Sequence, residues 1–153
     1  MYYFKSQKAL DFYCVCIHCP KMRVSPAACD TILAFFADTQ FSPSDYDMIL
    51  TGDLGEIGSD ILKKLLADNN LNVKDRLFDC GCMIFDQNEQ DTHSGGSGCG
   101  CSASVLNSYI MKRLKDGSLK KLLFCATGAL MSPTTTMQGE TIPSIAHLVQ
   151  IEV

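Results

Sequence analysis

The sequence predicts an α/β fold, with a mixed, mostly parallel sheet of the five-stranded type and helices on both faces. Strand-like and helix-like segments alternate along most of the chain, which favours parallel strands joined by helices. Of the 153 residues, 46% are hydrophobic and 20% are charged, as in globular domains. The last apolar segment follows a long loop instead of a helix, so it is expected to join the sheet as an antiparallel strand.

The first half of the chain predicts a helix, a strand and a second helix. Ser25 and Pro26 are expected to open the first helix, because serine is a favourable N-cap and proline suits the first turn. The buried face of this helix is predicted to contain Ala28, Ile32, Leu33, Phe35 and Phe36. A short strand is expected over 46–51, and the glycine-rich sequence GDLGEIGSD leads to a helix over 60–66.

The second half predicts two more strands around the strongest helix, and then a final strand. Residues 76–85 predict a strand. Gly81 within it either weakens the strand or marks a position where another part of the chain packs closely. A polar connection leads to an amphipathic helix over 101–115, which is expected to end at Asp116-Gly117. Strands are predicted over 120–128 and 144–153, on either side of a long loop.

The first 21 residues differ in character from the rest. The sequence ALDFYCVCIHC could form a buried strand ending at Pro20, but no amphipathic pattern continues from it. The chain is therefore expected to divide into residues 1–21, with one candidate strand, and a domain over 22–153. The N-terminus lacks a clean apolar core and a cleavage site, and no apolar run approaches roughly 18 residues, so neither a signal peptide nor a transmembrane segment is predicted.

Charge and cysteine content narrow the classes of function. The net charge of −4 and the pI near 5.2 argue against a nucleic-acid partner, since such proteins usually carry a basic face. Nine cysteines, an odd number, without a secretion signal favour reduced thiols in the cytoplasm over a disulfide framework. Most of these thiols are expected to be buried, as free cysteine usually is.

Closely spaced cysteines raise the question of a metal site. They occur as CVCIHC, where Cys14, Cys16 and Cys19 surround His18, and as two Cys-x-Cys pairs at 80–82 and 99–101. Structural zinc sites usually use Cys-x-x-Cys spacing, and a strand would place both members of a Cys-x-Cys pair on one face through packing alone. No metal ligand and no cofactor are therefore predicted.

A cysteine nucleophile is a second chemical alternative. Cys99 and Cys101 lie near the predicted start of the helix over 101–115, where a thiol pKa is usually lowered. A nucleophile also needs a base. His18 lies in the unassigned N-terminal stretch and His147 in the final strand, while His93 is near the glycine loop but in a polar turn, where it is expected to be exposed. No catalytic residue is therefore predicted.

The sequence GGSGCGCSA, at Gly95 to Ala103, permits two interpretations. Backbone N–H groups at the start of a helix favour an anion, and glycine allows its close approach. The same glycines also suit a tight turn that packs closely on the sheet. A second glycine-rich turn, with Gly52, Gly55 and Gly58, follows another predicted strand. Two such turns at strand ends are what the floor of a shared pocket would need.

Four sequence strings, taken in order, resemble the stage V sporulation protein AD family of endospore-forming bacteria. They are YDMILTGDLGEIG, LFDCGCMIFD, GGSGCGCSA and CATGALMSPTTTMQGETIPSIAH. The resemblance runs from about residue 22 to residue 153 and excludes residues 1–21. That family is similar to thiolases and ketoacyl synthases, in which two similar halves form one layered body. The resemblance therefore implies a thiolase-like fold for 22–153, as the C-terminal half-domain only.

The resemblance also implies that the acyl chemistry of thiolases is absent. Condensing enzymes place a histidine after a strand like the one over 46–51, and an asparagine or histidine before the long helix. Here these positions fall in Thr51-Gly52-Asp53 and in 98–101, and neither contains such a residue. Two alternatives stay open: an acyltransferase of the thiolase or ketoacyl synthase type, and a small cysteine-rich metal or redox protein.

The implied function is the binding of dipicolinic acid, a pyridine dicarboxylate, during its uptake into the spore or its release. Ligand contacts are expected from the two glycine turns, at Gly52, Asp53, Gly96, Ser97, Gly98 and Cys99. The ligand is the acid itself or its calcium chelate. Expected partners are other proteins of the spore dipicolinate channel and either the N-terminal half of the fold or a second copy, because a lone half exposes an apolar patch. The implied location is cytoplasmic, at the spore inner membrane through these partners.

Overall fold

The sheet is mixed and mostly parallel, as the sequence predicts. The computed structural model describes residues 3–5, 20–73, 75–86, 88–129, 132–138 and 143–153. Five strands in these ranges form one sheet in the order β1-β5-β4-β2-β3. They are β1 (Tyr3–Lys5), β2 (Met48–Thr51), β3 (Leu77–Asp79), β4 (Lys121–Ala129) and β5 (Ser144–Glu152). Since β5 is antiparallel to both β4 and β1, and β2 is parallel to β3 and β4, only β5 runs against the other described strands.

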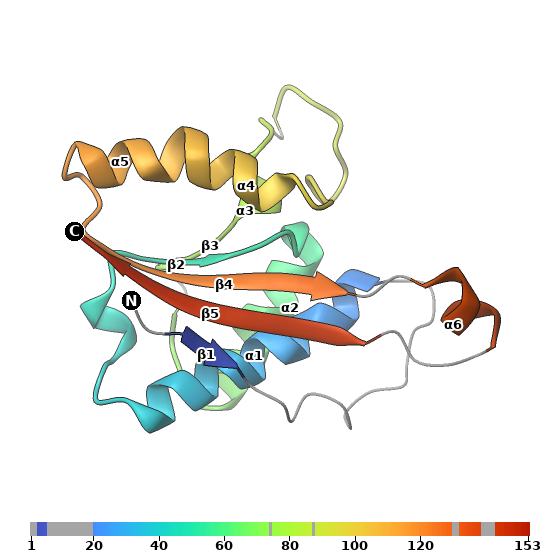
Figure 1. The fold of residues 1–153 in the computed structure, drawn as a ribbon, viewed down its shortest axis with the longest axis horizontal. Coiled ribbons are helices and arrows are strands. Elements are labelled where there is room, and N and C mark those ends of the chain that lie inside the picture. Colours follow the sequence, from blue (N-terminus) through green and yellow to red (C-terminus); the bar gives the residue numbers. More distant parts are fainter. Residues whose placement is uncertain (1–2, 6–19, 74, 87, 130–131, 139–142) are drawn as a thin grey trace.

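Helices cover both faces of the sheet (Figure 1). One face carries α1 (Pro20–Asp38) and α2 (Gly55–Asp68). The other face carries α3 (Cys80–Met83) and one continuous helical segment, composed of α4 (Cys101–Val105), a π-helical turn (Leu106–Ile110) and α5 (Met111–Lys115). A short helix, α6 (Pro133–Met137), lies between β4 and β5. The prediction of helices on both faces is therefore confirmed.

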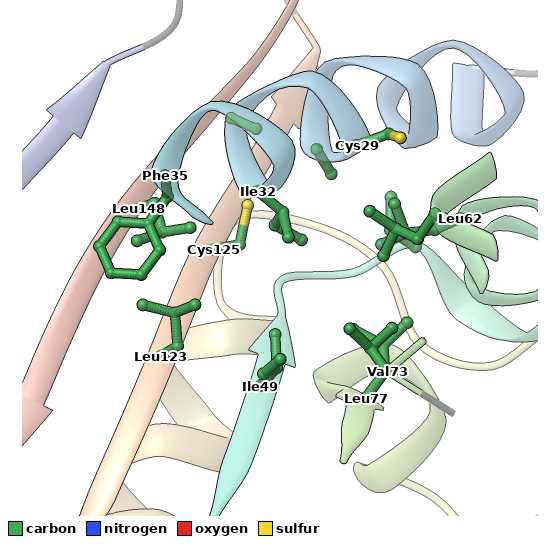
Figure 2. Close-up of a cluster of buried hydrophobic side chains, with 14 of the residues drawn as sticks. Cys29, Ile32, Phe35, Ile49, Leu62, Val73, Leu77, Leu123, Cys125 and Leu148 are labelled. Atoms are coloured by element: carbon green, nitrogen blue, oxygen red, sulfur yellow. The ribbon is translucent and has the colours of Figure 1, made fainter. Parts of the chain in front are cut away.

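Alternation along the strands builds a hydrophobic core on each face. In β2, Ile49 packs with α1 and α2, while Met48 and Leu50 pack with the helix over 101–115. Successive side chains of a strand point to opposite faces, so four consecutive buried residues serve two cores. Figure 2 shows the first core, in which side chains from α1 and α2 meet those of the sheet, among them Ile32, Leu62, Leu123 and Leu148.

The predicted start of the first helix is wrong, because α1 begins at Pro20 and runs through Ser25 and Pro26. Ser25 does not cap the helix. Its buried hydroxyl donates a hydrogen bond to the carbonyl of Gly58 in α2, at 2.8 Å. The second helix also begins earlier than predicted, at Gly55, so the glycine-rich sequence forms its first turns. Ser25 and Gly58, which by sequence pattern indicate a cap and a turn, therefore lie inside α1 and α2 and form a contact between these two helices.

The predicted strand over 76–85 is wrong beyond Asp79, where the chain turns into α3. The Asp79 carboxylate accepts a hydrogen bond from the N–H of Gly81 at 2.9 Å and so caps the new helix. A β-carbon at Gly81 would lie 2.5 Å from the carbonyl oxygen of Gly96, so this turn packs against the glycine loop. Cys80 and Cys82 therefore lie in a helical turn and do not share a face of the sheet.

The expectation that no helix precedes the last strand is wrong, because α6 lies between β4 and β5. The helix over 101–115 and the remaining predicted strands agree with the structure to within two residues. The helical segment over 101–115 ends where predicted, and Gly117 after it has a φ of +74°. The strands predicted over 46–51, 120–128 and 144–153 correspond to β2, β4 and β5. The candidate strand in ALDFYCVCIHC lies outside the described residues.

Candidate functional site

A cleft of about 430 Å³ opens at the carboxyl ends of β2 and β4. Ligand sites in open α/β sheets commonly occupy this edge, where the connecting loops diverge. The cleft draws on α1, the turn after β2, the glycine loop, the start of α4 and the end of β4. Its lining residues are Val24, Asp53, Leu54, Ser97, Gly98, Cys99, Ser102, Thr127, Gly128 and Ala129.

Four of the six residues predicted to contact a ligand line this cleft: Asp53, Ser97, Gly98 and Cys99. The other two, Gly52 and Gly96, lie next to the lining residues and pack against the body of the protein. A β-carbon at Gly96 would lie 2.5 Å from Cγ2 of Ile84. At Gly52 it would collide with the hydroxyl of Thr127. Both glycines therefore serve close packing at the edge of the cleft.

Asp53 joins the two glycine turns to each other and to β4. Its Oδ2 accepts hydrogen bonds from Ser97 Oγ at 3.1 Å and from the N–H of Gly98 at 2.9 Å. Thr127 Oγ1 donates to Oδ1 at 3.4 Å and accepts from the backbone N–H of Asp53 at 3.1 Å. The Gly98 N–H, which the sequence suggested for an anionic ligand, is thus bonded to a carboxylate of the protein itself. The lining residues include no lysine or arginine, so Asp53 gives the cleft a negative charge.

The glycines of GGSGCG have different roles. Gly95 has a φ of +95° and lies against the carbonyl group of Gly81, and the N–H of Gly96 donates to that carbonyl at 2.7 Å. Gly98 has a φ of +111° but faces open space. Gly100 also faces open space and has an ordinary φ of −90°. The first two glycines thus fix the loop to α3, and the third allows the chain to turn at the cleft.

Asp79, at the end of β3, supports the cleft from beneath and is not among the residues predicted for the site. This side chain is only 2% exposed and does not line the cleft. Its carboxylate accepts hydrogen bonds from Thr51 Oγ1 and from the N–H groups of Leu54, Gly55 and Gly81. An acidic residue between a strand and a glycine was the available signal, since such a residue can cap a helix.

Two buried thiols, Cys80 and Cys125, and the half-buried thiol of Cys82 are poorly suited to ligate a metal or act as nucleophiles. Burial, with a smaller contribution from the charge of Asp79, raises the pKa of Cys80 to about 12 and that of Cys82 to about 11. Burial also raises the pKa of Cys125 to about 12. These groups stay protonated near neutral pH, whereas both chemistries require a thiolate. In the part of the chain that the structure describes, no group of three or more His, Cys, Asp or Glu side chains could hold a metal ion. The cluster from Cys14 to Cys19 lies outside that part.

Two of the three histidines are described, and neither lines the cleft. His93 is exposed, with a φ of +51°, and its Nδ1 lies 3.2 Å from a carboxylate oxygen of Asp91. His147 lies in β5 opposite Ala126. Cys99, the thiol that lines the cleft, therefore has no imidazole beside it among the described lining residues.

Comparison with known proteins identifies the family. The family described as "Stage V sporulation protein AD (SpoVAD)" matches residues 21–152. The chain is also 47% identical over 129 residues to the stage V sporulation protein AD of Bacillus subtilis (strain 168). That alignment covers 84% of this chain and 38% of the relative, so the chain spans well under half of the longer protein. Among the helices of the described residues, none is both long and apolar enough to cross a bilayer. The chain belongs to the stage V sporulation protein AD family of sporulation proteins.

Proposed function

We propose that this chain takes part in dipicolinate transport in the spore, and that its cleft binds dipicolinate as the calcium chelate, without acyl chemistry. The observation that carries the proposal is the Asp53 carboxylate in a cleft whose lining includes no lysine or arginine. A free dicarboxylate would meet a like charge there. At about 4 Å and an effective dielectric constant near 20, two unit charges interact by about 4 kcal/mol. The charge of the chelated calcium removes this repulsion and makes Asp53 an attractive partner.

The donor set of the cleft suits a partly coordinated calcium ion. Ca²⁺ takes six to eight oxygen ligands, so a chelating dicarboxylate leaves positions open for the protein and water. Asp53 offers a carboxylate, and the hydroxyls of Ser97 and Thr127 already lie within hydrogen-bonding distance of it. A planar pyridine ring could pack against the apolar side chain of Val24 and against Gly128, both of which line the cleft.

The same lining supports binding over catalysis. Acyl transfer through Cys99 would need a base, and no imidazole lies among the described lining residues. An acyltransferase would instead form a thioester on Cys99 when treated with an acyl-coenzyme A, which intact mass spectrometry detects. We expect no such adduct. No observation in the described residues favours the metal or redox alternative.

Replacement of Asp53 by asparagine tests the proposed function. Calorimetric titration of the wild-type chain with calcium dipicolinate is expected to show binding, and Asp53→Asn should weaken it at least tenfold, or about 1.4 kcal/mol. The variant removes the negative charge and keeps the shape of the side chain. Excess EDTA removes the calcium, so the same titration then measures binding of free dipicolinate. The variant should bind this dianion at least as well as the wild type does, because the negative charge of Asp53 no longer repels it.

Asp116→Asn is the matched control for this titration. Asp116 also accepts a backbone hydrogen bond, from Ser118 at 2.9 Å, but lies beyond the far end of the helix over 101–115. Its replacement should leave the affinity unchanged. Equal binding of calcium dipicolinate by wild type and Asp53→Asn would contradict the assignment of Asp53, and no binding by the wild type would contradict the proposed function.

We further propose that the outer surface of the helix over 101–115 receives the other half of the fold. Tyr109 is 48% exposed, Met111 39% and Phe85 40%, and a groove of about 330 Å³ runs beside Tyr109 between α3 and this helix. Nothing in the described chain covers this layer (Figure 1). Without another half, the purified chain should self-associate through this surface, and Tyr109→Ser should weaken the association. Sedimentation equilibrium measures both, and a monomer at all concentrations would contradict the assignment.

A further inference from the structure

The carboxylate of Asp79 lies between the turn that follows β2 and the turn at Gly81, against which the glycine loop packs. Asp79 does not line the cleft itself. The side chain is buried, at 2% exposure, and four donors converge on it. Three of these donors are backbone N–H groups and one is a hydroxyl. A carboxylate with this many hydrogen bonds fixes the groups around it, because moving any of them would leave a buried polar atom unpaired.

The Oδ2 atom of Asp79 anchors the turn that carries Asp53. It accepts from Thr51 Oγ1 at 2.6 Å and from the N–H of Leu54 at 3.0 Å. Thr51 ends β2 and Leu54 precedes α2, so the two anchored residues lie on either side of Asp53 in the chain. The position of the Asp53 carboxylate thus depends on a turn that is held at both ends by the same oxygen.

The Oδ1 atom anchors the structure against which the glycine loop packs. It accepts from the N–H groups of Gly55 at 2.8 Å and Gly81 at 2.9 Å. The carbonyl of Gly81 in turn accepts the N–H of Gly96 at 2.7 Å, immediately before Ser97. The turn that carries Asp53 and the glycine loop that carries Ser97 form two walls of the cleft. Both walls are therefore connected to the buried Asp79 carboxylate through short chains of hydrogen bonds.

We infer that Asp79 is a positioning residue for the cleft, which sets the distance between the Asp53 carboxylate and the segment Ser97-Gly98. This inference rests on the proposed function, since it assigns the geometry of the same cleft. A ligand held by both walls requires them at a fixed separation before it arrives, because ordering them on binding lowers affinity. Asparagine has the same shape as aspartate, but its amide NH₂ replaces one oxygen and would face two donors.

Asp79→Asn, with Asp47→Asn as a matched control, tests the inference. Asp47 accepts two backbone N–H groups, of Lys120 at 2.8 Å and Lys121 at 2.9 Å, at the opposite end of the sheet. At a temperature where each variant is fully folded, calcium dipicolinate should bind Asp79→Asn at least tenfold more weakly than wild type. Asp47→Asn should stay within twofold. Wild-type affinity in Asp79→Asn would overturn the inference while leaving the proposed function intact.

A second readout needs no ligand. Amide hydrogen exchange at Gly96 and Gly98, whose N–H groups are bonded to Gly81 and Asp53, should be faster in Asp79→Asn by at least tenfold and unchanged in Asp47→Asn. Unchanged exchange at both glycines would also overturn the inference. Should Asp79→Asn fail to fold, Thr51→Val removes one donor of the four and is expected to raise exchange at Gly98 by a smaller factor. Unchanged exchange in Thr51→Val would then count against a positioning role.

Discussion

Gly95→Ala is expected to destabilise the protein by about 2–4 kcal/mol, measured as the free energy of unfolding in urea. Gly95 has a φ of +95°, in a region that residues with a β-carbon rarely adopt. The added β-carbon would also press on the backbone carbonyl of Gly81, which itself accepts the N–H of Gly96. Relief of this collision requires the glycine loop to move away from α3.

Gly100→Ala is the control in the same loop. A β-carbon at Gly100 meets nothing within 4 Å, and its φ of −90° and ψ of −13° suit alanine. This change should stabilise the protein by about 0.4–1 kcal/mol, because alanine restricts the unfolded chain more than glycine does. Equal stabilities for the two variants would contradict the division of the loop into glycines that pack against α3 and glycines that face open space.

Ile32→Ala is expected to cost about 2–5 kcal/mol of unfolding free energy, because it opens a cavity in the main core. Ile32 is fully buried on α1, at 0% exposure, and faces Ile49 and Leu123 of the sheet (Figure 2). The matched control is Ile57→Ala on α2, where the side chain is 52% exposed and the expected change is within about 0.5 kcal/mol. Similar losses for both variants in urea unfolding would contradict the packing of α1 on the sheet.

Most of the fold could be predicted because local pattern and tertiary structure agree. The helix over 101–115 has an apolar side that packs on β2 and β4, and a glycine at its end. The errors occur where a side chain has a distant partner. Ser25 indicates a helix start, but Gly58, on another helix, accepts its hydroxyl hydrogen. The strand predicted over 76–85 stops at Asp79, because the carboxylate of Asp79 accepts hydrogen bonds from the N–H groups of Gly55 and Gly81 and so caps α3.

The candidate site could be predicted in part, from glycines that mark turns at the ends of strands. Asp53 and Ser97 were found because they lie within these turns. Thr127 was missed because its place in the cleft depends on strand register. Thr51, the last residue of β2, pairs with Cys125 of β4. Thr127 therefore lies in β4 two residues beyond the point where β2, the neighbouring strand, ends. Val24 was missed because α1 begins earlier than the sequence indicates and so places this residue at the cleft.

Thermal unfolding of the wild-type chain tests the proposed binding of calcium dipicolinate in the cleft. A ligand that binds only the folded state adds about 2.7 kcal/mol at a concentration of 100 times its dissociation constant. For a chain of this size, that raises the unfolding midpoint by roughly 5–10 °C. We predict such a rise with calcium dipicolinate and none with calcium alone. A cooperative transition whose midpoint does not change at any concentration of calcium dipicolinate would contradict the proposed binding.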